Sequence, residues 1–322
     1  MSCSVKKPSP AFTRRSFLQS VSGLALSPLL SLAPYKPLFA AQSPASAILT
    51  RRIPSTGEAL PVIGMGTWLT FSVGGSEAGR ARCVKILEVF FNRGGGLIDS
   101  SPMYGSSEEV IGHCLERISH HPGLFSATKV WIIGEALGRY QMNNSQDLWD
   151  VPRFDLMQIH NLLDWRSHLE TLKEWKAAGR IRYIGITTSH GRRHEDLEQA
   201  LIEEDFDFVQ FSYNVNNRLA EQRLLPLAAE RGIAVIINRP FQTGALFDRV
   251  RGKALPPWAN EIEVANWAQF FLKYIISHPA VTCTIPATSQ VAHMQENMGA
   301  GYGVLPDAAM RERMHRYFNS VT

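Results

Sequence analysis

The chain alternates between short apolar runs and longer segments in which hydrophobic residues recur with helical spacing. The short runs are rich in β-branched and aromatic residues and are bounded by turn formers, which predicts strands. Eight such runs cover residues 62–68, 96–101, 124–130, 154–160, 181–187, 206–212, 233–238 and 281–286. Several of the helical segments between them end on glycine, as helices often do: Gly94, Gly179 and Gly232.

Eight strands that alternate with helices predict an α/β fold, the (β/α)8 or TIM barrel, in one domain over residues 41–322. Residues 47–68 favour an N-terminal β-hairpin, with its turn at 55–58, that leads into the first barrel strand. A doubly wound sheet is the rival arrangement, but no Gly-x-Gly-x-x-Gly sequence joins the first strand to the first helix. Helical periodicity is poorest at residues 135–151, where turn formers are frequent.

The first 40 residues have the composition of a targeting segment, with five basic and no acidic residues. Arg14 and Arg15 precede an apolar run and a small-residue stretch, which is the three-part layout of a secretory signal. The arginine pair, followed by Phe17 and Leu18, resembles a twin-arginine signal. We therefore expect residues 1–40 to be a signal peptide read by the twin-arginine export machinery, and the protein to be periplasmic or otherwise exported. A chance basic N-terminus or a membrane anchor is the alternative, although Pro28 interrupts the apolar run.

The positive net charge of the chain comes mostly from this segment. The whole chain carries a formal charge of +4, but residues 41–322 have 28 basic and 29 acidic residues. That balance gives no indication of nucleic acid binding. Cys83, Cys114 and Cys283 have no metal-ligand spacing, so we expect buried thiols and no metal site.

Polar residues end several of the predicted strands, where the active sites of such barrels lie. Asp99, Lys129 and His160 end three successive strands, and Tyr104 follows the first of them by five residues. Because Asp and Lys are rarely buried unless paired, we expect Asp99 and Lys129 to form an ion pair at one barrel height. Lys129 would then lower the pKa of Tyr104, and His160 would orient a substrate oxygen.

This set favours carbonyl reduction, in which Tyr104 gives a proton to the oxygen and a cofactor supplies hydride. Two other interpretations remain open at this point. One is a structural Asp–Lys pair with an incidental Tyr and His. The other is a metal-dependent hydrolase that uses Asp99 and His160, although Lys129 would repel a cation there.

Six stretches resemble the aldo-keto reductase family and occur in that family's order: GMGTW, IDSSPMYGSSEEVIG, SATKV, DLMQIHN, LKEWKAAGRIRYIGIT and IPATSQVAHMQEN. The resemblance implies a (β/α)8 barrel closed at its bottom by the hairpin. It also implies nicotinamide-dependent reduction of an aldehyde or ketone, or the reverse oxidation. The family's catalytic tetrad falls on Asp99, Tyr104, Lys129 and His160.

The same resemblance implies which residues meet the cofactor. Thr187, Thr188 and Gln210 would hold the nicotinamide carboxamide, with two threonines in place of the usual serine–asparagine pair. Asn238 occupies the position of an aromatic residue that stacks on the nicotinamide, and Arg239 would lie beside the pyrophosphate. Trp68, which ends the first strand, would line the substrate pocket.

The segment after the last strand bears on the choice between NADP and NAD. The basic residues that often bind the 2′-phosphate are absent, but Thr288 and Ser289 could bind a phosphate at a helix N-terminus. Glu296 and Asn297 match the adenine side of the family's site. The resemblance favours NADP, with NAD also possible. A slow-turnover NADP-binding sensor or accessory subunit is the alternative to an enzyme acting on a small-molecule carbonyl.

Overall fold

The computed structural model describes residues 47–118 and 120–322. The expected signal peptide at residues 1–40, with Arg14 and Arg15, lies outside the described residues. Within these described ranges, no helix combines the length and apolar character needed to span a bilayer.

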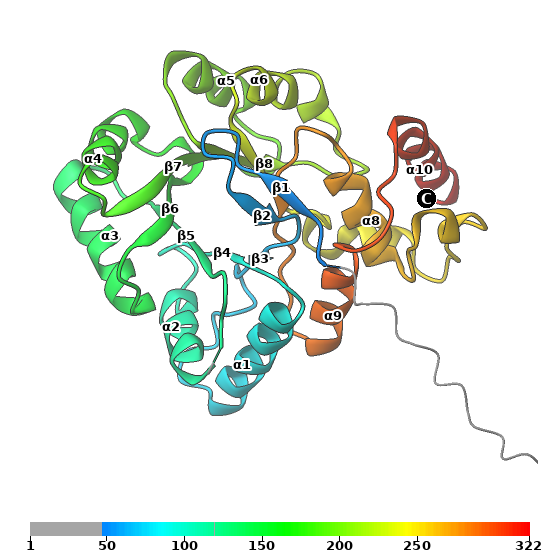
Figure 1. Ribbon diagram of the computed structural model, residues 1–322, viewed down its shortest axis with the longest axis horizontal. Helices are drawn as coiled ribbons and strands as arrows, with labels where there is room; N and C mark the ends of the chain where they lie inside the picture. The colour runs from blue at the N-terminus through cyan, green and yellow to red at the C-terminus, as the bar shows by residue number, and fades with distance from the viewer. Residues whose placement is uncertain (1–46, 119) are drawn as a thin grey trace, which may run out of the picture. The chain divides into compact units, whose positions relative to one another are not determined.

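Eight parallel strands follow one another in chain order around a barrel in the described chain (Figure 1). Parallel bridges from Ile63 to Thr284 and from Gly66 to Ala287 join the first strand to the last. This closure confirms the (β/α)8 barrel and rules out the doubly wound sheet. The strands are β3 (Met65–Gly66), β4 (Leu97–Asp99), β5 (Phe125–Val130), β6 (Phe154–Ile159), β7 (Ile181–Thr187), β8 (Phe208–Ser212), β9 (Ala234–Asn238) and β10 (Cys283–Thr284).

The predicted N-terminal hairpin is also present, as β1 (Thr50–Arg52) paired antiparallel with β2 (Ala59–Pro61). It crosses one end of the barrel in Figure 1, where both strands are blue. Ile53 and Leu60 belong to the same buried cluster as Leu97 and Phe125, which begin their strands. The hairpin therefore closes the end of the barrel at which the strands begin, which leaves the carboxyl ends for the site.

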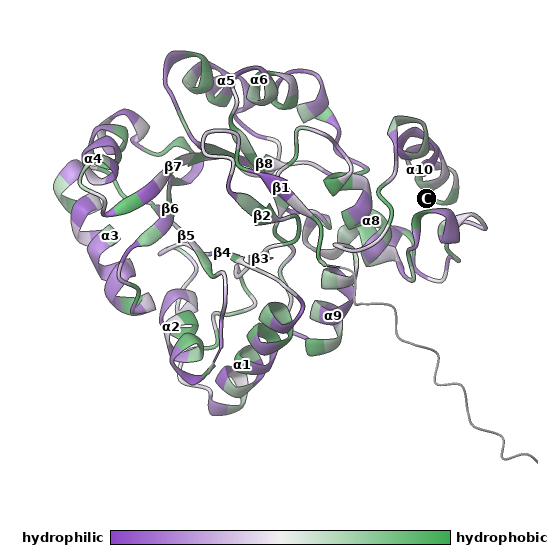
Figure 2. Ribbon diagram, viewed as in Figure 1, coloured by the Kyte–Doolittle hydropathy of each residue, from purple (hydrophilic) through white to green (hydrophobic). Residues whose placement is uncertain are grey.

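Amphipathic helices surround the barrel and pack their apolar faces against it. Hydrophobic and hydrophilic residues therefore alternate along them (Figure 2). In the described chain they are α1 (Glu77–Asn92), α2 (Ser107–Arg117), α3 (Glu135–Trp149), α4 (Trp165–Ala177), α5 (His194–Glu203), α6 (Leu224–Glu230), α7 (Ala245–Arg249), α8 (Trp267–Ile276), α9 (Val291–Gly299) and α10 (Ala308–Val321).

Helix α3 is regular, although its sequence showed the poorest helical periodicity. Its buried positions are Gly138, Met142, Ser145 and Trp149, which recur with helical spacing. Two of these four are small or polar residues, so the buried face is hard to recognise from hydrophobicity. A Cβ at Gly138 would lie 2.5 Å from His168 of the next helix, which explains why the helices approach closely there.

Side chains alternate between two cores along each strand. In β6, Leu156 belongs to the inner cluster of the barrel, whereas Met157 and Ile159 belong to the outer cluster packed against the helices. The same alternation turns Gln158 and His160 inward, toward the carboxyl end of the barrel. The period of two thus determines which polar residues meet at the site.

Candidate active site

A cavity of about 380 Å³ lies at the carboxyl ends of the strands. Most of the site residues predicted from the sequence line it, and Lys129 lies fully buried against Asp99. Those that line it are Trp68, Asp99, Tyr104, His160, Thr187, Thr188, Gln210, Asn238 and Arg239.

Asp99 and Lys129 form a buried ion pair, with 2.5 Å between Oδ2 and Nζ. Lys129 also donates to the backbone oxygen of Ser100 at 2.7 Å. Burial is the largest single influence and would lower the pKa of Lys129, but Asp99 and Tyr104 together outweigh it, so the pKa is raised. The ammonium therefore keeps its charge inside the barrel.

Two amides complete the shell around the Asp99 carboxylate. Its Oδ1 accepts hydrogen bonds from Gln158 Nε2 at 2.8 Å and Gln210 Nε2 at 3.0 Å. The Gln158 side chain has room because Gly185 stands beside it: a Cβ there would lie 2.8 Å from its Cγ. With one ammonium and two amides as donors, the buried carboxylate is satisfied.

Strand register separates the two partners of the ion pair more than we expected. The register aligns Asp99 with Ala127, two residues before Lys129, and aligns Lys129 with Gln158. The expectation of equal height was therefore wrong, and the long lysine side chain spans the offset. The ion pair itself was predicted correctly.

Tyr104 lies in the segment between β4 and α2, half-buried in the cavity wall. Its backbone N–H donates to Ser101 O at 2.9 Å, and Ser107 Oγ donates to its carbonyl at 2.8 Å. Nζ of Lys129 lies 5.2 Å from the centre of the Tyr104 ring. These contacts hold the phenol beside the ion pair.

The pKa of Tyr104 is raised, in contrast to the lowered value expected from its neighbour. Burial of the phenol is the largest cause, and Asp99 adds to it. Lys129 does lower the pKa, as predicted, but its effect is smaller than that of burial. Tyr104 therefore carries its proton at neutral pH.

His160 is held in a defined orientation by a residue that the sequence did not single out. Ser101 Oγ lies 2.9 Å from His160 Nδ1, and both side chains are buried. The same oxygen accepts the backbone N–H of Met103 at 3.3 Å, so its hydroxyl hydrogen is free for Nδ1. Donation of that hydrogen to Nδ1 would put the imidazole hydrogen on Nε2, which is the tautomer we infer.

The imidazole of His160 stays neutral. Burial, reinforced by the Lys129 ammonium, lowers its pKa to about 2. Its ring is 5.7 Å from that of Tyr104, and the two planes are 86° apart. A neutral ring with hydrogen on Nε2 is a hydrogen-bond donor next to the phenol.

The carboxamide-binding residues expected from the sequence differ in what they can offer. Thr187 Oγ1 accepts the backbone N–H of Asn161 at 3.0 Å, which leaves its hydroxyl hydrogen available. Thr188 donates its hydroxyl to the carbonyl of Arg192. Gln210 uses its amide hydrogens on Asp99 and Gln158, and its Oε1, which already accepts from Asn238, has a second lone pair for a ligand.

Asn238 replaces the expected aromatic ring with an anchored amide. Its Nδ2 donates to Thr188 O at 2.9 Å and Gln210 Oε1 at 3.2 Å. Its Oδ1 accepts from Ser212 Oγ at 2.7 Å. A planar amide, held on both sides, therefore lines the cavity at this position.

An aromatic neighbour of His160 was also missed. The Trp131 ring lies 6.4 Å from the imidazole, and 40% of the residue is exposed. Its signal in the sequence was its position, two residues after Lys129 at the end of the same strand. Trp131 is not part of the cavity lining, whereas Trp68 is.

The residues expected around the adenine half of the cofactor lie outside the cavity lining. Thr288 and Ser289 precede α9, and Thr288 Oγ1 accepts the backbone N–H of Gln290 at 3.1 Å. Glu296 and Asn297 are in α9 itself. The residues predicted to contact the nicotinamide therefore lie together in the cavity wall. The four residues predicted to contact the adenine half do not line this cavity.

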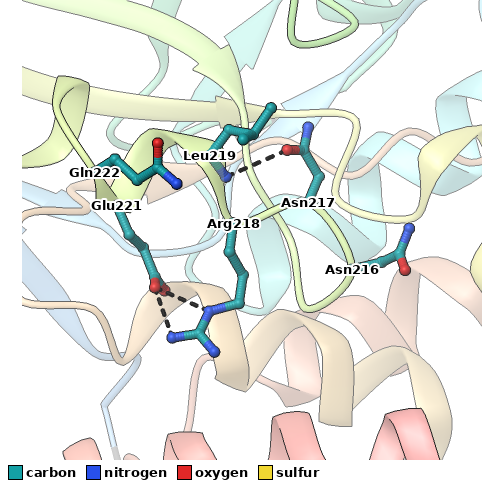
Figure 3. A pocket seen from close by; sticks show the side chains of 6 residues that line it. All are labelled: Asn216, Asn217, Arg218, Leu219, Glu221 and Gln222. Carbon is teal, nitrogen blue, oxygen red and sulfur yellow. Dashed lines mark hydrogen bonds and ion pairs between the residues drawn. The ribbon is translucent and has the colours of Figure 1, made fainter.

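A second hollow, of about 630 Å³, adjoins the segment before α6 (Figure 3). Its charged side chains point at each other: Arg218 and Glu221 form an ion pair at 2.7 Å. Because its charges are paired internally, this hollow offers little for catalysis. Among the described residues, no three His, Cys, Asp or Glu side chains are grouped as metal ligands.

A model described as the Aldo/keto reductase family matches residues 62–313. The chain belongs to this family. It is accordingly an NAD(P)H-dependent oxidoreductase.

Individual relatives of this aldo/keto reductase are distant. An NADH-specific methylglyoxal reductase of Escherichia coli K12 is 25% identical over 264 residues, covering 70% of this chain and 78% of the relative. A pyridoxal 4-dehydrogenase of Microbacterium luteolum is 24% identical over 250 residues, covering 61% and 71%. An aldo-keto reductase from Klebsiella pneumoniae, solved in complex with NADPH, superposes with a TM-score of 0.69 at 24% identity, covering 85% and 96%. The structural likeness shows the shared barrel fold.

Proposed function

We propose that this aldo/keto reductase reduces the carbonyl group of a small aldehyde or ketone, with Tyr104 as the proton donor. The observation that carries the proposal is the cluster of a protonated phenol, a neutral imidazole and a buried ion pair in one cavity. These groups supply a proton and a hydrogen bond to an oxygen, but no nucleophile. That division suits reduction of a carbonyl rather than hydrolysis.

Each residue has a definable role in such a reaction. Nε2–H of His160 donates to the carbonyl oxygen and orients it toward the phenol. Tyr104 gives its proton to that oxygen as negative charge develops there. Lys129 stabilises the phenolate left behind, and Asp99 keeps the ammonium in position. Water is kept from the ion pair because both partners are buried.

The cavity fits a nicotinamide, which supplies hydride when bound. A primary carboxamide needs one donor for its oxygen and one acceptor for its amino group. The Thr187 hydroxyl and Gln210 Oε1 are a free donor and an acceptor in the cavity wall. We assign the carboxamide to these two residues, with Thr188 as an acceptor and Asn238 as a flat wall.

The remaining cofactor assignments are proposals from sequence resemblance. NADP is favoured because Thr288 and Ser289 can offer hydroxyl and backbone groups to a phosphate before α9. Glu296 and Asn297 would contact the adenine side. Two related Klebsiella pneumoniae structures were solved with NADP and with NADPH, whereas the Escherichia coli relative is NADH-specific. Binding titrations with both cofactors decide between them.

Purified protein tests the proposal directly. We expect saturable binding of NADPH or NADH, and consumption of its 340 nm absorbance with an aldehyde. Tyr104→Phe should lower the rate of reduction by roughly 100- to 10,000-fold while leaving cofactor affinity unchanged. Undiminished reduction by this variant would disprove the proton-donor role. Binding without turnover across an aldehyde panel would favour the sensor or accessory-subunit alternative.

We also propose that the chain is exported by the twin-arginine machinery, on the basis of residues 1–40. Cell fractionation of the wild type and an Arg14→Lys/Arg15→Lys double variant tests this. An unchanged distribution between the two would contradict it.

A further inference from the structure

Arg239 follows β9 directly and extends its side chain over the active-site cavity. The centre of its guanidinium lies 6.0 Å from the Trp68 ring, and both residues line the cavity. Its backbone is in the left-handed region, with φ of 51°. The Arg239 carbonyl accepts hydrogen bonds from Asn214 Nδ2 and from the backbone N–H of Gln242. Two hydrogen bonds therefore hold the backbone from which the Arg239 side chain extends.

The Arg239 guanidinium is partly shielded from solvent, yet it has no hydrogen-bond acceptor or ion-pair partner among the described residues. It is half-buried, and burial lowers its pKa. Every other arginine or lysine in residues 47–118 and 120–322 that lacks a hydrogen-bond or ion-pair partner is exposed. These exposed side chains are Arg82, Lys85, Arg93, Arg153, Arg192 and Lys253.

The cavity consequently holds one uncompensated positive charge. The only carboxylate in its lining is Asp99, which is already neutralised by Lys129. Tyr104 and His160 are uncharged at neutral pH. The pKa of His190 is lowered by burial and by Arg239 and Arg192, so this ring is neutral and adds no second positive charge.

A half-buried guanidinium without a partner is costly unless a ligand supplies the anion. Its planar fork matches the paired oxygens of a carboxylate or phosphate. Sequence resemblance would place Arg239 beside the cofactor's pyrophosphate. Its position over Trp68, in the cavity that also holds Tyr104 and His160, favours the molecule being reduced.

We propose that Arg239 binds a carboxylate or phosphate group within this cavity, and that the carbonyl substrate carries that group. Trp68 lies under the guanidinium and would contact the apolar part of the same substrate. This inference rests on the proposed reductase function, but anion binding can be measured without turnover. The cofactor's pyrophosphate is the other source of the same chemistry, and the experiment separates the two.

The test compares two aldehydes that differ in one charge, 4-carboxybenzaldehyde and methyl 4-formylbenzoate, with wild type and Arg239→Gln. We expect the variant to lose roughly 10- to 100-fold in kcat/KM for the acid and little for the ester. Arg239→Lys should recover part of the loss because it restores the charge without the fork. Arg192→Gln, an exposed neighbouring charge without a partner, is the matched control and should discriminate like wild type.

Cofactor affinity identifies the source of the anion. Weaker NADPH binding by Arg239→Gln, with equal losses of kcat/KM for both aldehydes, would identify the cofactor's pyrophosphate as the anion that Arg239 binds. That result would overturn the substrate assignment. Equal activity of wild type and variant in every assay would overturn the anion site itself.

Calorimetric binding of benzoate against benzamide, with the oxidised cofactor present, needs no turnover. Tighter binding of benzoate that is lost in Arg239→Gln supports the anion site even if no aldehyde is reduced. Equal affinity for the two compounds in wild type contradicts it. Thermal unfolding of each variant shows whether the fold is kept.

Discussion

Ser101 Oγ lies 2.9 Å from Nδ1 of His160, and the backbone N–H of Met103 donates to the same oxygen. We infer that the serine accepts from the backbone and donates to the imidazole. In that arrangement the ring hydrogen is on Nε2. In the proposed reaction, Nε2–H is the group that must face the carbonyl.

Replacing Ser101 with alanine should loosen the ring and release the tautomer. We expect kcat for carbonyl reduction to fall by roughly tenfold, as for loss of one buried hydrogen bond, with cofactor affinity unchanged. Nitrogen-15 shifts of the His160 ring should report an increased share of the Nδ1–H form. Ser101→Thr keeps the hydroxyl and should restore both the rate and the spectrum.

Ser100→Ala is the matched control for that experiment. Ser100 is adjacent and buried, but its hydroxyl accepts from Thr67 and makes no hydrogen bond to His160. It should leave the nitrogen shifts at their wild-type positions. Equal shifts in Ser101→Ala and wild type would show that the serine does not set the tautomer.

Much of the fold followed from periodicity, because a buried parallel strand is a short apolar run that hydrophobicity reveals. All eight strands and the hairpin were found that way. Helix α3 was harder to recognise because two of its four buried residues, Gly138 and Ser145, are not apolar. Close helix packing accounts for Gly138, and a hydrogen bond to Glu108 accounts for Ser145.

The site was predictable where a charged residue interrupts an apolar strand, as at Asp99 and Lys129. Gln158 left a weaker signal: it lies two residues before His160, so strand alternation placed it on the same inward face. Ser101 left none, since a serine beside a strand end is ordinary. Its role depends on a distance between β4 and β6 that only the folded barrel supplies.

The pH dependence of catalysis should follow Tyr104 rather than His160. His160, with a pKa of about 2, stays neutral above pH 5 and produces no acidic limb there. Reduction needs the phenol, so its rate should be flat near neutrality and fall as pH rises through the raised tyrosine pKa. Oxidation of an alcohol needs the phenolate and should rise over the same range.

Removing the ammonium should move both limbs to higher pH, because Lys129 is the group that lowers the tyrosine pKa. The double variant Asp99→Asn/Lys129→Met is preferable to Lys129→Met alone, which would strand a buried carboxylate. The measurement is the rate of alcohol oxidation as pH is raised from neutrality past 10, the ordinary tyrosine pKa, for as long as the protein stays folded. A limb that stays at its wild-type pH in the folded double variant would show that another group controls it.

Glu108 is a buried carboxylate that joins three elements behind the site. It lies in the first turn of α2 and accepts hydrogen bonds from Thr128 of β5, next to Lys129, and from two residues of α3. Those two are Ser145, at 2.9 Å, and Trp149, at 3.3 Å. Glu108→Ala would leave three buried donors without an acceptor and should lower the free energy of unfolding by about 3–5 kcal/mol. Glu109→Ala removes the adjacent exposed carboxylate and should change it by about 0–1 kcal/mol.

A pH series then tests the charge state of Glu108. Burial raises its pKa, so the folded protein holds this proton more tightly than the unfolded chain does. Its contribution to stability is fully present below the unfolded carboxyl pKa and is lost as pH rises through the folded value. Glu108→Gln cannot titrate at this position. The unfolding free energy of wild type minus that of this variant should therefore decrease as pH rises. A difference that grows with pH would mean that the carboxyl is stabilised as the anion, with Lys129 outweighing burial.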